Sequence, residues 1–515
     1  MWKNISFIKD MTLLIAVFFS FYSFAKDRNG DLFKTSHESS FLQREFGSQL
    51  NSLQVLANPL FGEPFYSLEN FENKMLGPIN EENDNFKNLL LVFPDYKVSK
   101  DNIHDIQQNQ LNQGLSVTPL WSYHAMPTHK GGIAFRHLDR QFQSSNNWQT
   151  LFKEYSSHLP DSVIRDNDVD SLSSIEKYEY LIGNTGFNIT ESQWQEGQKY
   201  MNLYGKVPSW IGLCHGTAPA SLNTKRPLFA ISLKSFDKKH DIKFYPSDIK
   251  NLISYAWAKS GGPSEIMGTR CGEVIRPSTR ASQRCLDTNP GSFHLAVINL
   301  MGIHGQPFII DSSAGHEVWN RSIKSYNYRF FRPGSRTLMD RLDHAMIAVK
   351  DFKSDPHAKY RSPEATHIVG VSMDLTYIVG TKANDRRVDS TSRDETDKTT
   401  YLYDVEIDKA GKIIGGEWQD LTHPDFLWVV GRDYNPRLFE DYLIDGQLQT
   451  YDGRQALSPT TISYAQTVAT RNEVLFTIIE AMIRISQDGD ERQTSCTSVA
   501  GISGSSTCTG SEVSL

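Results

Sequence analysis

The spacing of apolar residues changes partway along the chain, and this change limits the fold more than any other feature. Residues 173–176 (Ser-Ser-Ile-Glu) fit a capping box that opens a helix. Ser247 can cap a second helix, in which apolar residues at 252–257 recur at helical spacing. Residues 369–379 instead alternate strictly between apolar and other side chains, which is typical of a half-buried strand. Helices followed by antiparallel strands predict an α+β fold.

Further strands are expected in the same half of the chain. Residues 293–299 alternate, and the short apolar run 307–311 follows a glycine-bounded turn at 302–305. Residues 401–408 and 412–418 flank Lys-Ala-Gly and read as a hairpin. We therefore expect the strand at 293–299 to be followed by a second strand that returns beside it.

The N-terminus carries the features of an export signal. Lys3 and Lys9 give the chain a short basic start. The apolar run that follows, residues 12–24, contains no charge. Ser23 and Ala25 are small residues at the two positions that a signal peptidase reads. We predict a cleaved signal over 1–25 and a secreted or extracytoplasmic protein, with a retained anchor as the alternative. No later stretch is apolar for long enough to span a bilayer, so no stable membrane insertion is expected after cleavage.

The remaining chain divides by composition. The net charge of −7 lacks the concentrated basic face that nucleic-acid binding requires, so no nucleic-acid partner is expected. Aromatic residues are scattered through a polar N-terminal region that reads either as a permanent accessory part or as a prosegment. The predicted parts are the N-terminal helical region 26–172, a main domain 173–435 that contains the candidate site residues, a helical extension 436–486 and a flexible Ser/Thr/Gly-rich tail 487–515.

Five cysteines in an exported chain leave one without a partner. Cys271 with Cys285, and Cys496 with Cys508, are close in sequence and lie in polar, turn-rich surroundings. Each pair would close a short loop and stabilise the fold by roughly 3 kcal/mol. We predict these two disulfides, which leave Cys214 as a free thiol.

Cys214 follows a glycine turn at Gly212 and precedes small residues suited to the start of a helix. A thiol at a helix N-terminus is close to unpaired N–H groups and to the positive end of the helix dipole, which favour the thiolate. The same N–H groups could hold an oxyanion. These surroundings indicate a nucleophile with a lowered pKa, although an inert buried thiol is the commoner fate of a single cysteine.

A cysteine nucleophile needs an imidazole and a group that orients it. His294 lies on the expected strand 293–299, and Asp311 ends the next one, so both could share one sheet. His304 falls in the turn, and His215 would point away from Cys214 if a helix begins there. From the residues alone, an ordinary strand histidine at position 294 is equally compatible with the pattern.

Five segments resemble the transglutaminase elicitor family, the cell-wall transglutaminases of oomycetes with relatives in marine bacteria. They are EKYEYLIGN (176–184), WIGLCHGTAPAS (210–221), NPGSFHLAVIN (289–299), FIIDSSAGHEVWN (308–320) and GGEWQDLTHPDFLW (415–428). The resemblance covers roughly 174–430. Its most specific motifs are Cys-His-Gly and Asn-Pro-Gly-x-Phe-His. Residues 318–320 also resemble the start of a surface peptide that plants recognise in the oomycete proteins.

The resemblance implies a Cys-His-Asp triad of Cys214, His294 and Asp311 on a papain-like core. It further implies γ-glutamyl transfer from protein-bound glutamine to lysine or to small amines, which would be the partners. A secreted cysteine peptidase or amidase would use the same residues, and a non-catalytic surface or elicitor-like binding protein is a second alternative.

The chemistry requires no cofactor, and calcium is a possible addition. Residues 166–170 have the alternating carboxylates of a calcium loop. Ser171 stands where such a loop needs glycine, and Lys177 stands where it needs a glutamate. A solvated acidic approach to the following helix is the simpler interpretation.

Overall fold

The computed structural model describes residues 100–143, 145–260, 264–268, 288–313, 317–420, 422–430, 435–437 and 439–488. The chain divides into two units, Met1–Asn58 and Pro59–Leu515, and every described residue belongs to the second. The predicted signal segment and the four cysteines of the predicted disulfides lie outside the described residues. None of the described helices is both long enough and apolar enough to cross a membrane.

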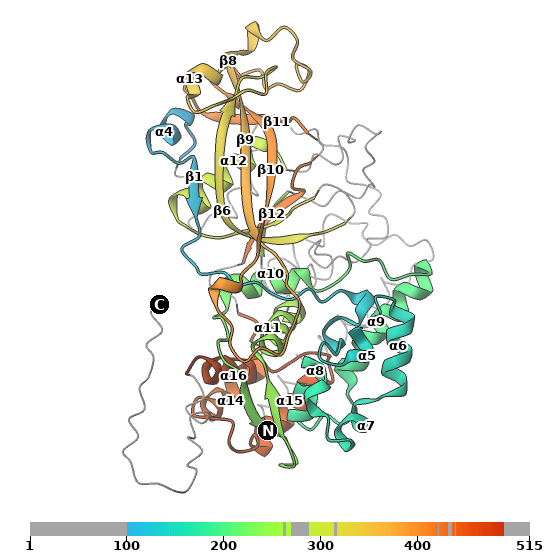
Figure 1. The fold of residues 1–515 in the computed structure, drawn as a ribbon. Coiled ribbons are helices and arrows are strands. Elements are labelled where there is room, and N and C mark those ends of the chain that lie inside the picture. Colours follow the sequence, from blue (N-terminus) through green and yellow to red (C-terminus); the bar gives the residue numbers. More distant parts are fainter. Residues whose placement is uncertain are drawn as a thin grey trace, which may run out of the picture. The chain divides into compact units, whose positions relative to one another are not determined.

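An antiparallel sheet forms one half of the described unit (Figure 1). Its strand order is β11-β10-β9-β6-β5-β12-β4, while β1 and β7 pair with β6 and β8 pairs with β9. The strands are β1 (Gln113–Leu115), β4 (Ser264–Gly268), β5 (Ile309–Asp311), β6 (Asn320–Phe331), β7 (Leu338–Met339), β8 (Ile347–Ala348), β9 (His367–Ile378), β10 (Thr396–Ile407), β11 (Ile413–Trp418) and β12 (Phe426–Val430). A separate hairpin joins β2 (Ile231–Lys234) to β3 (Asp241–Phe244).

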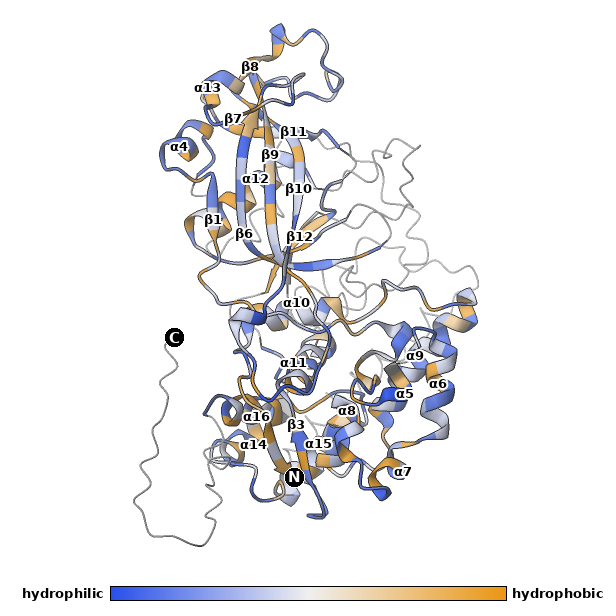
Figure 2. Ribbon diagram, viewed as in Figure 1, coloured by the Kyte–Doolittle hydropathy of each residue, from blue (hydrophilic) through white to orange (hydrophobic). Residues whose placement is uncertain are grey.

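The strand predictions at 307–311, 369–379 and 401–418 are confirmed. Strand β9 buries Val371, Met373 and Leu375 on one face, and the hydropathy colours alternate along it (Figure 2). Strands β10 and β11 form the expected hairpin. Burial of one sheet face against helices fixes the pairing, because a shift of one residue would turn these apolar side chains to the other face.

The expected strand at 293–299 is wrong. Residues Pro290–Val297 form helix α12, which continues as a π-helical segment over Ile298–Ile303. The Asn289 side chain accepts hydrogen bonds from the N–H groups of Gly291 and Ser292, and Pro290 occupies the first turn. Asparagine at the N-cap and proline at the first helical position are a helix-start signal, and this signal outweighs the short alternation that follows.

Most of the helices make up the other half of the described unit, whereas α4, α12 and α13 lie beside the sheet (Figure 1). Helix α8 begins with the predicted capping box, in which Ser173 and Glu176 each bond the other's backbone. Helix α11 begins at Pro246, so Ser247 lies inside it instead of capping it. The α-helices are α4 (Ile103–Gln108), α5 (Arg140–Gln143), α6 (Trp148–Ser157), α7 (Pro160–Arg165), α8 (Ser174–Leu181), α9 (Asn188–Tyr204), α10 (Cys214–Asn223), α11 (Pro246–Ser260), α12 (Pro290–Val297), α13 (Leu342–Ala345), α14 (Phe439–Leu448), α15 (Pro459–Ala469) and α16 (Phe476–Asp488).

Residues 100–172 are packed into the same core as the segments that follow them. Strand β1 pairs with β6, and Trp121 and Trp148 are almost fully buried. The Arg136 guanidinium is fully buried and donates to the Glu176 carboxylate of α8 over 2.7 Å. This part of the N-terminal region therefore supplies core contacts and buried charge to the sheet and to the helices.

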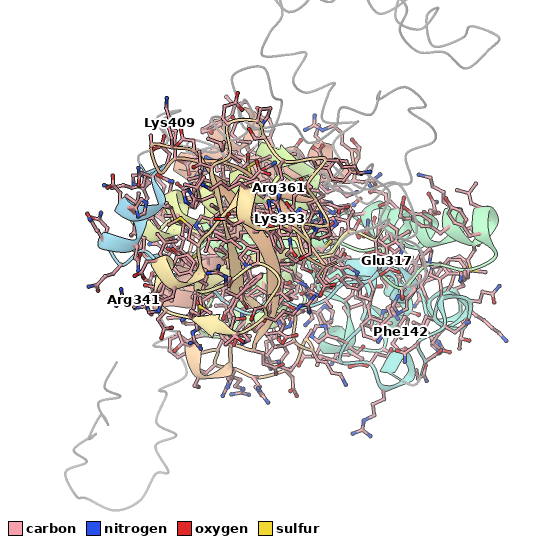
Figure 3. All side chains as sticks on the ribbon, turned by 90° about the horizontal axis from the view of Figure 1, so that it is seen from above. Phe142, Glu317, Arg341, Lys353, Arg361 and Lys409 are labelled. Atoms are coloured by element: carbon pink, nitrogen blue, oxygen red, sulfur yellow. The ribbon has the colours of Figure 1, made fainter. Side chains whose placement is uncertain are left out.

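Several buried carboxylates surround one guanidinium on the β10–β11 side of the sheet. Arg361, which Figure 3 labels, donates to Asp404 over 2.8 Å and to Asp355 over 2.9 Å. Glu417 is 7% exposed and lies beside Asp404 and His357. Burial and the neighbouring Asp404 charge raise the pKa of Glu417 to about 8.

The raised pKa predicts a pH-dependent stability. Between about pH 4.5 and pH 8, folded Glu417 holds a proton that the unfolded chain has released. This contribution to the free energy of unfolding is fully present below about pH 4.5. It is lost as the pH rises through about 8, with a slope of up to roughly 1.4 kcal/mol per pH unit. Glu417→Gln should flatten the dependence of the urea midpoint on pH between 5 and 8, whereas curves parallel to the wild type would contradict the assignment.

Candidate active site around Cys214

Helix α10 begins at Cys214, as the sequence predicts, and it packs between helix α11 and the sheet (Figure 1). Gly216 makes this packing possible. A Cβ atom there would lie 2.3 Å from the Ser254 carbonyl oxygen and 2.5 Å from the Ala258 Cβ, both on α11. The glycine of the Cys-His-Gly motif therefore lets α10 approach α11 closely, and this contact positions the thiol.

The same helix is fastened to strand β6 by buried hydroxyl groups. The Ser322 Oγ donates to the Ala218 carbonyl oxygen over 3.0 Å and lies 2.9 Å from the Ser221 Oγ. Residues two apart on a strand share a face, so Asn320 points to the same side of β6 as Ser322. The strand thereby places the Asn320 side chain beside the first residue of α10.

Two residues of the 317–320 segment contact the sulfur. The Cys214 thiol lies 3.6 Å from the Val318 carbonyl oxygen, to which it can donate. The Asn320 side-chain amide donates to the sulfur from 3.5 Å, and the Asn320 backbone N–H also bonds it. Both Val318 and Asn320 are about 1% exposed. The segment that resembles a surface peptide is thus partly buried here and forms the wall of the site.

Asp311 ends strand β5 and is paired with Asn320 across the sheet. Its carboxylate accepts a hydrogen bond from the Trp319 backbone N–H over 2.8 Å. The Asp311 charge is close enough to raise the pKa of the Cys214 thiol. The structure therefore brings two of the three predicted site residues, Cys214 and Asp311, into one neighbourhood.

A cation adjoins the thiol from the next position on β6. The Arg321 guanidinium lies 5.3 Å from the Trp319 ring centre and 5.4 Å from the Tyr377 ring centre. Tyr123 is 4% exposed. Burial raises the pKa of its hydroxyl, the nearby Arg321 charge lowers it, and Cys214 raises it. The Arg321 charge favours ionisation of the thiol, in opposition to Asp311.

The expected lowering of the thiol pKa is not found. Burial raises the pKa of Cys214 above its ordinary value, and the Asn320 donors and Arg321 offset part of this effect. Desolvation disfavours the charged thiolate more strongly than these groups favour it. The described arrangement therefore holds a protonated thiol at neutral pH.

His294 lies in helix α12, where its ring is fully buried among aromatic side chains. Its Nδ1 is 2.9 Å from the Tyr403 hydroxyl, and its ring centre is 5.0 Å from that of Tyr328. Burial lowers the pKa of His294 to about 3, so the ring is neutral. Among the described residues, its hydrogen bonding does not extend to Cys214 or Asp311.

His215 and His304 lie where the sequence predicts. The His215 ring bonds the backbone of Ala258 on helix α11 and therefore points away from the sulfur. His304 is exposed and follows the π-helical segment.

Replacing His294 by alanine should destabilise the fold by about 3 kcal/mol, because it empties a space enclosed by aromatic rings. Urea unfolding of His294→Ala measures this loss, with exposed His304→Ala as the control. Alkylation of Cys214 in the folded variant should stay within about threefold of the wild-type rate. Alkylation slowed more than tenfold at unchanged pH would instead make His294 the partner of the thiol.

The acidic segment 166–170 takes part in ordinary helix termini. Asp166 caps helix α7, and residues Val169–Ser171 form a single 3-10 turn. Glu176 and Lys177 are engaged in buried ion pairs with Arg136 and Asp248. Within the ranges that the structure describes, no group of three or more His, Cys, Asp or Glu side chains is arranged to hold a metal ion.

A cavity of about 910 Å³ lies near the segment that precedes Cys214. Its wall includes Met126 and Pro127, and the Pro127 backbone bridges to Gly212. Its lining does not include Cys214, Asp311 or His294. The cavity thus adjoins the loop that holds the thiol but is not the site itself.

Nothing in the sequence indicated Asn320, Arg321 and Tyr123 around the thiol, or Trp428 as the partner of Asn320. Asn320 and Trp428 do fall at or near the ends of segments that carry the family resemblance, but no spacing rule joins them to Cys214. They converge only because β6 and β12 both adjoin β5 in the sheet.

Comparison with known proteins gives one family and one related structure. The transglutaminase elicitor model matches residues 98–436, which is more than half of the chain and begins well before the first motif at 176. The crystal structure of the GP42 transglutaminase from Phytophthora sojae is similar at 19% identity and a TM-score of 0.46, over 75% of this chain and 98% of that one. No curated protein matches. On the family match, this chain belongs to the transglutaminase elicitor family.

Proposed function

We propose that the protein is an exported protein-glutamine γ-glutamyltransferase whose nucleophile is Cys214. The observation that carries this proposal is the thiol at the first residue of α10, with two Asn320 donors directed at its sulfur. Family membership supports the same chemistry. A thiol on a helix that packs against an antiparallel sheet also supports the papain-like core that the resemblance implies.

In the first half-reaction, the Cys214 sulfur bonds the γ-carbon of a glutamine side chain, and the C=O electron pair moves to oxygen. When the carbonyl re-forms, the C–N bond breaks and ammonia leaves with the proton that the thiol has lost. The helix begins at Cys214, so the N–H of this residue lies in the first turn, where no intrahelical acceptor is available, and it can bond the oxyanion.

In the second half-reaction, an amine attacks the thioester. An isopeptide bond forms, the C–S bond breaks, and a proton from the amine returns to sulfur. Water in place of the amine gives glutamate. The Asp311 carboxylate beside the thiol would stabilise positive charge on the departing ammonia or on the attacking amine.

The resemblance assigns the imidazole role to His294, and this assignment rests on the sequence motif alone. Its buried, neutral ring contacts Tyr403 instead of the thiol. The alkylation rate of Cys214 in His294→Ala decides whether His294 belongs to the mechanism.

The proposed activity is tested with purified mature protein, a glutamine-bearing protein and a labelled amine, with and without calcium. Label incorporation with release of ammonia supports the proposal. Chain cleavage without incorporation would support the peptidase or amidase alternative. An intact substrate in all conditions, with an unreactive Cys214, would support a non-catalytic elicitor-like binding protein.

A further inference from the structure

Asn320 is held in one orientation beside the reactive sulfur. The Trp428 indole N–H donates to the Asn320 side-chain oxygen over 2.9 Å. An indole N–H can only donate, so the oxygen of the amide must face Trp428 and the NH₂ group must face the other way. That NH₂ group is 3.5 Å from the Cys214 sulfur.

The surroundings keep this arrangement rigid and largely free of water. Asn320 is 1% exposed and Trp428 is 3% exposed. Asn320 is the first residue of β6, paired with Asp311, and Ser322 two residues later fastens the strand to α10. A donor that is fixed in a buried site before reaction needs little reorganisation when charge develops near it.

Acylation moves negative charge from the sulfur to an oxygen two bonds away. When the sulfur bonds the carbonyl carbon, the former thiolate pair becomes the C–S bond and the C=O pair becomes the oxyanion. The Asn320 NH₂ group carries two N–H bonds, so the amide can keep its orientation at the sulfur while one of them donates to this oxygen. The Cys214 backbone N–H approaches from the helix side, and Asn320 approaches from the strand side.

We propose that the Asn320 side-chain amide is the second oxyanion donor of the acylation step and that Trp428 is the positioning residue that orients it. This inference rests on the proposed function, since it assigns a role within that reaction. It predicts that Asn320 stabilises the tetrahedral intermediate more than it stabilises the thiolate that precedes it.

Two reactions of the same sulfur separate these roles. Alkylation by iodoacetamide takes place at a saturated carbon and forms no oxyanion, whereas acylation by glutamine does form one. With enzyme in excess over a glutamine-bearing protein, ammonia release reports acylation directly. Both rates are measured for the full mature chain, and their ratio cancels effects on folding and on thiol ionisation.

Asn320→Asp replaces the donor by an acceptor of similar size, and Asn320→Ala removes it. Each should slow acylation by about 10²- to 10³-fold, while alkylation at a matched thiolate fraction changes by less than about threefold. The acylation loss should appear in kcat more than in KM, since the bond forms in the transition state. Asn299→Ala serves as a control, because Asn299 is also buried but bonds the backbone of Lys100 and Leu295.

Trp428→Phe keeps the ring and removes only the N–H, so it remains informative if the Asn320 variants fail to fold. It should slow acylation about tenfold and leave alkylation unchanged. Equal losses in both reactions would overturn the oxyanion role and leave Asn320 as a thiolate donor only. Acylation within threefold of wild type in the Asn320 and Trp428 variants would also overturn it. A wild-type enzyme that alkylates but releases no ammonia would instead overturn the proposed function, and the Asn320 assignment with it.

Discussion

Replacing Cys214 by serine is expected to abolish amine incorporation, with a loss of at least about 10⁴-fold. A neutral hydroxyl in this enclosed site is a far weaker nucleophile than a thiolate, and in related nucleophile–base systems the loss of the nucleophile removes nearly all of the chemical acceleration. Incorporation of a labelled amine into a glutamine-bearing protein measures the effect. The urea midpoint should change little, because serine nearly conserves the volume of cysteine.

The matched control is His215→Ala, because His215 is adjacent in sequence but its ring bonds Ala258 on the far side of the helix. This variant should keep most of its activity in the folded fraction. Activity in Cys214→Ser close to wild type would exclude Cys214 as the nucleophile.

Glu176→Gln is expected to lower the free energy of unfolding by about 3 to 5 kcal/mol. The change leaves the fully buried Arg136 guanidinium without its carboxylate, and an uncompensated buried charge is costly. It also weakens the capping box of α8, in which the Glu176 carboxylate accepts the Ser173 backbone N–H over 2.8 Å. Urea unfolding at fixed pH measures the loss.

An exposed ion pair provides the comparison. Asp340→Asn breaks the bridge from Arg329 to Asp340, whose side chains are 45% and 81% exposed, and it should cost less than about 1 kcal/mol. A double change of Arg136 and Glu176 to apolar residues should cost less than Glu176→Gln alone, since it removes both charges. A single variant as stable as the wild type would mean that Arg136 finds water or another partner.

This ion pair also bears on the N-terminal region. Arg136 lies within 26–172, the region that from sequence reads as either an accessory part or a prosegment, and it neutralises a buried charge on α8. The family match likewise begins at residue 98. If residues 100–172 were removed, Glu176 would lose its partner and β6 would lose its pairing with β1.

Local signals predicted the elements whose residues interact with near neighbours in the chain. The capping box at Ser173 and Glu176, the hairpin of β10 and β11, and the start of α10 at Cys214 all depend on residues a few positions apart. The prediction at 293–299 failed because the interpretation followed the alternation and gave no weight to the Asn-Pro helix start before it.

The surroundings of Cys214 depended on tertiary structure. The sequence alone predicted a free thiol at Cys214, the start of a helix at that residue, and the resemblance to a transglutaminase family. Only the sheet pairs Asp311 of β5 with Asn320 of β6. It also brings Trp428 of β12 within hydrogen-bonding distance of Asn320, because β12 pairs with β5 on its other side. Strand order depends on the burial of whole sheet faces, to which many residues far apart in the sequence contribute. It therefore cannot be predicted from a local sequence pattern. For the same reason the thiol pKa could not be read from the helix start, because desolvation by remote segments outweighs the local dipole.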